Sequence, residues 1–131
     1  MSCAEIEKEF NELFVTFIND ISRICPNSLI SNNINIINKF ITNEPTKVLD
    51  LFTKHVLKYK NYIDKGDENF FLNHNYSDDF NDKNNFMKVF EFKNIWKTLN
   101  TENKENIILY MQYLCGLSLK YFNKKYMIKD L

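Results

Sequence analysis

The chain has 131 residues, 17 basic and 17 acidic side chains, and 44% hydrophobic and 15% aromatic residues. This composition excludes an intrinsically disordered chain, in which low hydrophobicity accompanies high net charge, and predicts one globular domain over residues 1–131. Because the chain holds only two glycines, it lacks the glycine-rich phosphate-binding loops of the usual nucleotide-binding enzymes.

The first predicted element is a helix over residues 3–24. Ser2 followed by Glu5 forms a capping-box pattern, in which each residue's side chain bonds the other's backbone N–H. From Ile6 to Cys25 the apolar residues recur at helical spacing, and Pro26 ends the pattern.

Two further apolar stripes predict the next two helices. Isoleucines at 30, 34, 37 and 41 predict a helix that ends near Thr42, while the Asn-rich residues 31–33 before it fit either a loop or a helix cap. Pro45 suits a first helical turn, and the apolar face from Val48 to Ile63 predicts a helix from about Thr46 that ends at Gly66.

Residues 67–85 predict a long acidic and aromatic loop with one short helical turn at residues 69–72. The segment contains five acidic residues and no lysine before Lys83. Aromatic side chains on such a loop either pack inward, which is the commoner outcome, or are offered to a partner.

The remaining pattern predicts a helix over residues 86–99 and a last, most buried helix over residues 102–122. In the last helix Gly116 suggests close approach of a neighbouring helix, because glycine has no side chain to keep it away. The expected fold is therefore all-α, a single compact bundle of about five helices with the 67–85 loop as its main irregular feature.

The candidate chemistry is sparse. His55 falls beside an apolar helix face, where a core-edge histidine is the ordinary case. His74, Asp78 and Asp79 are a conceivable metal cluster whose geometry nothing fixes, and the Asp79 region lacks the glycine and glutamate of a calcium loop. We therefore predict no enzyme activity, no metal site and no cofactor.

A cluster of lysines and aromatic residues near the carboxyl end suggests a polyanion as a second class of partner. Lysines attract phosphates, and aromatic side chains stack on unpaired bases. The alternative is that lysines at a helix carboxyl end simply complement the helix dipole. The cluster consists of Lys120, Lys124, Lys125, Lys129 and Tyr126.

The cysteines and the first residues bear on the compartment. Cys3, Cys25 and Cys115 lack CxxC spacing, which favours reduced thiols over a disulfide framework. The chain begins without a signal-peptide pattern, and its longest apolar-rich run, residues 107–119, is too short to span a bilayer. We therefore expect an intracellular protein without a membrane partner.

Several short sequences between residues 54 and 121 carry a family resemblance. They are Asp67-Glu68-Asn69-Phe70-Phe71-Leu72, Tyr76-Ser77-Asp78, Ile95-Trp96-Lys97 and the run from Asn103 to Leu114. This part of the chain resembles small helical proteins of large nucleocytoplasmic DNA viruses of eukaryotes. The resemblance implies a viral context inside a host cell, in its cytoplasm, its nucleus or the virion, and implies no particular activity.

Together these observations predict a non-enzymatic interaction or structural protein. Its expected partner is another protein or a second copy of the chain, bound through the 67–85 loop. The expected partner-binding residues are Phe70, Phe71, Tyr76, Asp78, Asp79 and Phe80. The alternative is a nucleic-acid-associated protein that uses the lysine cluster near the carboxyl end.

Overall fold

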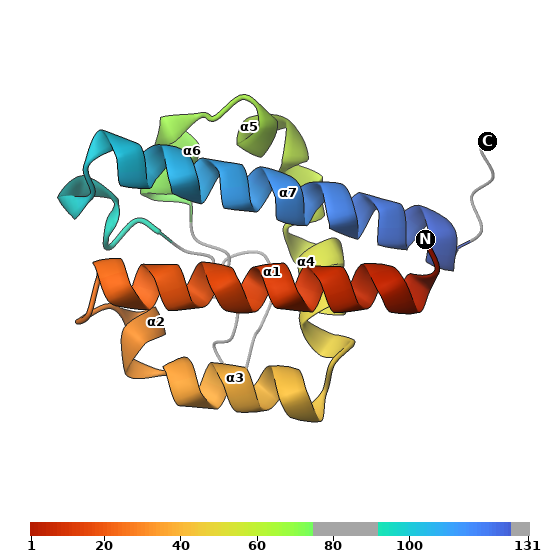
Figure 1. Ribbon diagram of the computed structural model, residues 1–131. Helices are drawn as coiled ribbons and strands as arrows, with labels where there is room; N and C mark the ends of the chain where they lie inside the picture. The colour runs from red at the N-terminus through yellow and green to blue at the C-terminus, as the bar shows by residue number, and fades with distance from the viewer. Residues whose placement is uncertain (75–91, 127–131) are drawn as a thin grey trace.

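The computed structural model describes residues 1–74 and 92–126, and these residues form only helices and turns (Figure 1). The all-α prediction is confirmed. The α-helices are α1 (Cys3–Ile24), α2 (Leu29–Asn32), α3 (Ile34–Asn43), α4 (Lys47–His55), α5 (Lys60–Asp64), α6 (Glu68–Asn73) and α7 (Thr101–Lys125). Two short 3₁₀ helices, η1 (Leu57–Tyr59) and η4 (Trp96–Thr98), complete the described elements.

Helix α1 has the predicted bounds because both of its ends are set by local chemistry. The Ser2 hydroxyl accepts from the Glu5 N–H at 3.1 Å, and the Glu5 carboxylate accepts from the Ser2 N–H at 2.9 Å. These bonds lower the pKa of the Glu5 carboxyl. At the other end Pro26, which has no N–H to donate, follows the C-cap residue Cys25.

Helices α1 and α7 lie antiparallel, side by side, and form the main pair of the fold (Figure 1). Helices α2, α3 and α4 also contact α1, and α4 and α5 contact α7. The core between them is aromatic: the Phe10 ring lies 5.4 Å from Phe52 of α4, and the Phe17 ring lies 4.9 Å from Tyr110 of α7. A hydrogen bond from the Tyr110 hydroxyl to the Asp20 carboxylate joins the two long helices.

The helix predicted to end near Thr42 consists of two helices, α2 and α3, which meet at Asn33. The Ser28 hydroxyl caps α2 by accepting from the Ser31 N–H at 3.2 Å. The Asn33 side chain donates to the Leu29 carbonyl at 2.8 Å, and its ψ of 15° departs from helical geometry. Asparagine side chains that bond nearby backbone groups compete with helix hydrogen bonds, which accounts for the break.

The predicted helix from Thr46 to Gly66 is interrupted after α4, and η1 leads into α5. Its apolar face is nevertheless the predicted one, because Val48, Phe52 and Ile63 are all buried. Gly66 ends α5 as predicted: its φ of 64° is left-handed, and its N–H donates to the Ile63 carbonyl at 3.0 Å. The Asp67 N–H donates to the Tyr62 carbonyl at 3.1 Å, which completes the helix-ending motif.

The predicted short helical turn at residues 69–72 is the helix α6, and the rest of the 67–85 segment beyond residue 74 lies outside the described residues. The helix predicted over residues 86–99 is wrong for its described part, 92–99, which forms a turn and the 3₁₀ helix η4. Phe92, Trp96 and Leu99 are buried there. The apolar spacing therefore predicted the buried side chains correctly, but it did not predict the 3₁₀ conformation of the backbone.

Helix α7 is central but is not buried all round. Gly116 does not mark a close helix approach, since a Cβ built on it meets nothing within 4 Å outside its own helix. Leu109 and Tyr113 on the same outer side are 48% and 65% exposed. Across residues 1–74 and 92–126, no helix is long and apolar enough to cross a membrane.

Candidate interaction surfaces

Phe71 and Trp96 form a buried corner between α6 and η4. Their rings stack at 5.1 Å with an angle of 10°, and both side chains are almost fully buried. The Trp96 Nε1–H donates to the Glu68 carboxylate at 3.0 Å, and Lys104 Nζ donates to the same oxygen at 2.9 Å. Phe71, named among the expected partner-binding residues, thus packs inward, which was the commoner outcome expected for the aromatic residues of this segment.

Phe70 lies half-buried in a second aromatic group at the edge of α5 and α6. Its ring stacks on Tyr62 at 5.7 Å and on His74 at 4.7 Å, and its centroid lies 5.4 Å from that of Tyr59. Tyr62 is the outermost member of the group and is 51% exposed. The other expected partner-binding residues, Tyr76, Asp78, Asp79 and Phe80, lie outside the described residues.

The carboxyl-end lysines do not form one patch, because they leave α7 on different sides. Lys125 faces α4, where its Nζ lies 3.3 Å from the Asp50 carboxylate and 5.3 Å from the centre of the Tyr121 ring. Lys120 and Lys124 line a separate hollow beside Met1. Tyr126 is exposed at the end of α7, and Lys129 lies outside the described residues.

The α4/α7 groove is the hollow between α4 and the last two turns of α7, with a volume of about 470 Å³. Lys47 and Lys54 of α4 join Lys125 along its sides. The ring of Tyr126 lies there too, 4.9 Å from that of Phe122. Sequence reasoning missed the two α4 lysines, because only the folded chain brings them to the end of α7.

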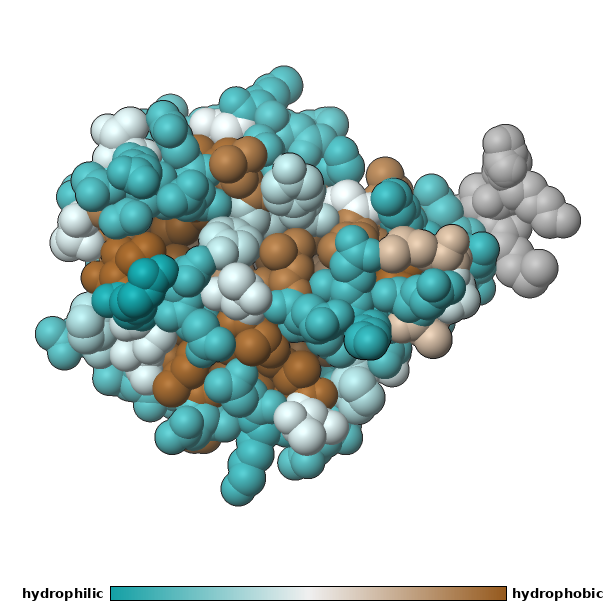
Figure 2. Space-filling view, viewed as in Figure 1, coloured by the Kyte–Doolittle hydropathy of each residue, from teal (hydrophilic) through white to brown (hydrophobic). Residues whose placement is uncertain are grey.

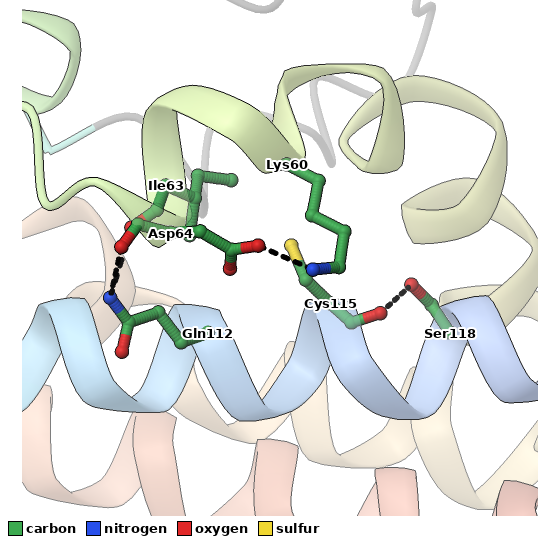
Figure 3. Close-up of polar contacts among 6 residues, drawn as sticks. All are labelled: Lys60, Ile63, Asp64, Gln112, Cys115 and Ser118. Atoms are coloured by element: carbon green, nitrogen blue, oxygen red, sulfur yellow. Dashed lines mark hydrogen bonds and ion pairs between the residues drawn. The ribbon is translucent and has the colours of Figure 1, made fainter.

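Cys115 lies between α7 and α5 in a position that suppresses thiol chemistry (Figure 3). Its side chain is fully buried, and burial, with a smaller contribution from Asp64, raises the pKa of the thiol to about 12. Lys60 and Asp64 form an ion pair one helical turn apart on α5 beside it. Because the thiolate is the nucleophile, Cys115 acts here as an apolar core residue.

Metal-binding groups do not converge in the part of the chain that the structure covers. No group of three or more His, Cys, Asp or Glu side chains suited to a metal ion occurs among residues 1–74 and 92–126. His55 is buried on α4, as expected for a histidine at the edge of the core. The conceivable cluster of His74 with Asp78 and Asp79 falls mostly on residues outside these ranges.

The α1/α7 groove is a hollow between α1 and α7 with a volume of about 700 Å³. Its floor is apolar, with Leu13 of α1 and Leu117 of α7, and Gly116 leaves it open on the α7 side. Figure 2 shows apolar side chains between polar ones across this face of the molecule. The full lining comprises Glu9, Glu12, Leu13, Thr16, Gln112, Tyr113, Gly116, Leu117 and Lys120.

The α1/α7 groove was not predicted, although the sequence holds a signal for the exposed apolar surface of α7 beside it. The wide apolar pattern of residues 107–122 suggested burial on nearly all sides. Leu109 and Tyr113, four residues apart, lie about half a turn from the buried stripe that includes Met111, Leu114 and Ser118. An apolar pair at that angle indicates a second, outward surface on the helix.

Asp20 and Gln112 carry further polar contacts that join separate helices. Asp20 binds both Arg23, at 2.8 Å, and the Tyr110 hydroxyl. The Gln112 side chain donates to the carbonyls of Ile63 and Asp64 at 3.1 and 3.2 Å, and so caps the end of α5 (Figure 3).

Comparison with models of known protein families, with curated proteins and with solved structures found no match to this chain.

Proposed function

We propose that the chain is a non-enzymatic interaction protein that binds a helix of a partner polypeptide, either another protein or a second copy of the chain, along the α1/α7 groove. The observation that carries this proposal is the exposure of Leu109 and Tyr113 beside an apolar-floored groove on the central helix. Large apolar side chains grouped on a surface mark interaction sites more often than single ones do.

The shape and chemistry of the groove favour an amphipathic helix as the partner element. A helix laid in a groove inserts apolar side chains at three- and four-residue spacing between two host helices. Leu13 and Leu117 offer the apolar floor for such side chains, and Glu9, Glu12 and Lys120 offer polar edges. An apolar centre with a polar rim is the usual composition of a specific protein interface.

Site-specific photo-crosslinking in cells that express the full chain tests this proposal. A benzophenone side chain is placed at position 113 in one variant and at position 109 in another. Both variants should crosslink to one common partner polypeptide, which mass spectrometry identifies. Tyr62, which is similarly exposed but lies on α5, provides the control position. Adducts of equal yield at all three positions, or nucleic acid as the only attached species, would contradict the proposal.

The α4/α7 groove favours a second candidate function, the binding of single-stranded nucleic acid. Lys47, Lys54 and Lys125 outnumber the one carboxylate, Asp50, along this groove. The exposed Tyr126 ring offers a surface on which a base can stack. The proposed affinity is modest, since lysine binds phosphate without the paired hydrogen bonds of arginine.

Salt dependence tests this second candidate. Binding of a fluorescent single-stranded oligonucleotide should weaken as salt rises, and the double variant Lys47→Ala, Lys54→Ala should lower both the affinity and the salt slope. Lys39→Ala, Lys97→Ala is the matched control, because both lysines are exposed on other elements. Equal binding by the two double variants, or no binding at low salt, would remove this candidate.

A further inference from the structure

We infer that the α1/α7 groove receives a second copy of this chain, with the two α7 helices packed antiparallel about a twofold axis beside Tyr113. This inference rests on the proposed function and names its partner. It follows from a row of outward-facing residues on α7, here called the α7 stripe. The stripe consists of Glu102, Glu105, Leu109, Tyr113, Gly116, Lys120 and Lys124.

The α7 stripe keeps to one side of the helix over nearly its whole length. Its members follow one another at steps of three, four and four residues, and the same steps then repeat. Eleven residues over three turns closely match the helical repeat, so the stripe stays straight along α7. All its side chains are exposed, and Gly116 is half-buried where the groove is open.

The charges of the stripe are complementary to the same stripe read in the opposite direction. Its first turn carries Glu102 and Glu105, and its last turns carry Lys120 and Lys124. An antiparallel second copy with its twofold axis beside Tyr113 brings each glutamate pair opposite the lysine pair of the other copy. An isologous interface needs this kind of self-complementarity, because one patch must face itself.

The centre of the stripe fits the same arrangement. In that register Leu109 of one copy lies opposite Gly116 of the other, where the Cβ position is open and the groove has a volume of about 700 Å³. The two Tyr113 side chains, each 65% exposed alone, lie together at the axis. Each copy therefore supplies a projecting Leu109 side chain and, at Gly116, the open space that receives Leu109 of the other copy.

The helix dipole by itself accounts for part of this pattern but not for its centre. Glutamate near an amino end and lysine near a carboxyl end stabilise any single helix. The dipole gives no reason for Leu109 and Tyr113 to be exposed or for glycine to lie between them and Lys120. Furthermore, no ion pair joins any of the four charged stripe residues to another residue among 1–74 and 92–126, and Lys124 acts on Glu5 of α1 only as a minor cause of the lowered Glu5 pKa.

Charge exchange between two variants of the full chain tests the arrangement. Sedimentation velocity over a range of concentrations should show a reversible dimer of the 15.8 kDa chain. Lys120→Glu, Lys124→Glu makes the stripe wholly acidic, and Glu102→Lys, Glu105→Lys makes it wholly basic. Each variant alone should dissociate at least about tenfold more readily, whereas an equimolar mixture of the two should form a heterodimer.

Two controls separate lost association from lost folding. Circular dichroism of each variant should match that of the original chain, because the changed side chains are exposed. Thermal melting at low protein concentration should still be cooperative, with only the modest loss of stability that reversed charges at the ends of α7 cost. The control variant Lys39→Glu, Lys97→Glu lowers the net charge as much as Lys120→Glu, Lys124→Glu does. It leaves the α7 stripe intact, so this variant should still form the dimer. Recovery of the dimer only on mixing is a result that misfolding of either variant cannot produce.

The outcomes also separate this inference from the proposed function. A chain that stays monomeric at all concentrations, or variants that dimerise as well alone as when mixed, would overturn the second copy as the partner. If the benzophenone at position 113 then attaches to a different polypeptide, the proposed function stands without the dimer. If it attaches to no polypeptide, both are wrong.

Discussion

The indole N–H of Trp96 donates to the carboxylate of Glu68, 28 residues earlier in the chain, at 3.0 Å. Lys104 Nζ bonds the same oxygen and lies 5.8 Å from the centre of the indole ring. One carboxylate therefore joins α6, η4 and the first turn of α7. This contact holds the stacked Phe71 and Trp96 rings in place at the end of the core.

Replacing Glu68 should lower the stability of the folded chain by an amount that depends on whether the new side chain can accept a hydrogen bond from Trp96. Glu68→Leu leaves the buried indole N–H without its acceptor and should lower the urea midpoint of unfolding. Glu68→Gln keeps an acceptor and should retain most of the midpoint. Fluorescence of Trp96, the single tryptophan, reports the transition. Equal midpoints for the two variants would show that the hydrogen bond contributes nothing.

The same residue predicts a dependence on acid. Hydrogen bonds from Lys104 and then Trp96 lower the pKa of Glu68 in the folded chain. Its contribution to stability is therefore present above the carboxyl's unfolded pKa and is lost as the pH falls through the lower, folded value. Urea midpoints of the original chain and Glu68→Gln should converge over that acidic range; a constant difference would contradict the assignment.

Tyr110 predicts a dependence on base. Burial, and then its hydrogen bond to Asp20, raises the pKa of its hydroxyl to about 12. Its contribution to stability is complete below the ordinary tyrosine pKa of about 10 and is lost as the pH rises toward 12. Tyr110→Phe should cost about 1 kcal/mol at neutral pH and lose less stability on the rise to pH 12.

Guanidinium unfolding at several alkaline pH values measures this effect. Tyr126→Phe is the matched control, because Tyr126 is 60% exposed at the carboxyl end of the same helix. It should follow the original chain at every pH. If both tyrosine variants change the pH profile equally, Tyr110 has no special role.

Alkylation should distinguish the three thiols. Cys115 is fully buried with its pKa raised to about 12, so iodoacetamide should leave it unmodified in the folded chain at mildly alkaline pH. Cys3, half-buried on the first turn of α1, should react first. Mass spectrometry of the digested protein gives the order. Rapid Cys115 modification without denaturant would mean that α5 opens away from α7.

The two glycines should respond to alanine with opposite signs. Gly66 has a φ of 64°, so Gly66→Ala should cost about 1–2 kcal/mol through backbone strain, although the added Cβ makes only ordinary contact with Ile108. Gly116 is inside a helix with open space beside it, so Gly116→Ala should stabilise the folded chain by about 0.5–1 kcal/mol. Thermal melts at low protein concentration compare them.

The sequence was most informative where local chemistry decides the structure. The capping box at Ser2 and Glu5, the long apolar stripe and Pro26 all act within a few residues of where they stand, and α1 has the predicted bounds. Gly66 is similar, because the left-handed φ that ends α5 is a property of one residue. Such features do not depend on what the rest of the chain does.

It was least informative where neighbouring elements select among similar local structures. Nothing in the period of Phe92, Trp96 and Leu99 distinguishes an α-helix from the observed 3₁₀ turn. The bond from Trp96 to Glu68 that anchors this turn joins residues far apart in sequence. Apolar spacing therefore predicts which side chains are buried better than it predicts the backbone geometry that buries them.

The candidate surfaces show the same difference between features that local sequence determines and features that depend on the packing of distant helices. The lysines at the end of α7 were found from the sequence, but their separation onto two sides and the addition of Lys47 and Lys54 required the packing of α4. The α1/α7 groove arises because two helices from opposite ends of the chain lie together. No local pattern could place Leu13 beside Leu117.

The pairing of α1 with α7 has a consequence for how the chain folds during its synthesis. Helix α1 is synthesised before the other helices described, whereas its main neighbour, α7, is synthesised after them, and the Asp20 to Tyr110 hydrogen bond spans 90 residues. Part of the phenylalanine-rich face of α1 therefore stays exposed to water until α7 has been synthesised. Nascent chains stalled before α7 should aggregate or recruit chaperones, whereas chains that include α7 should bury this face of α1.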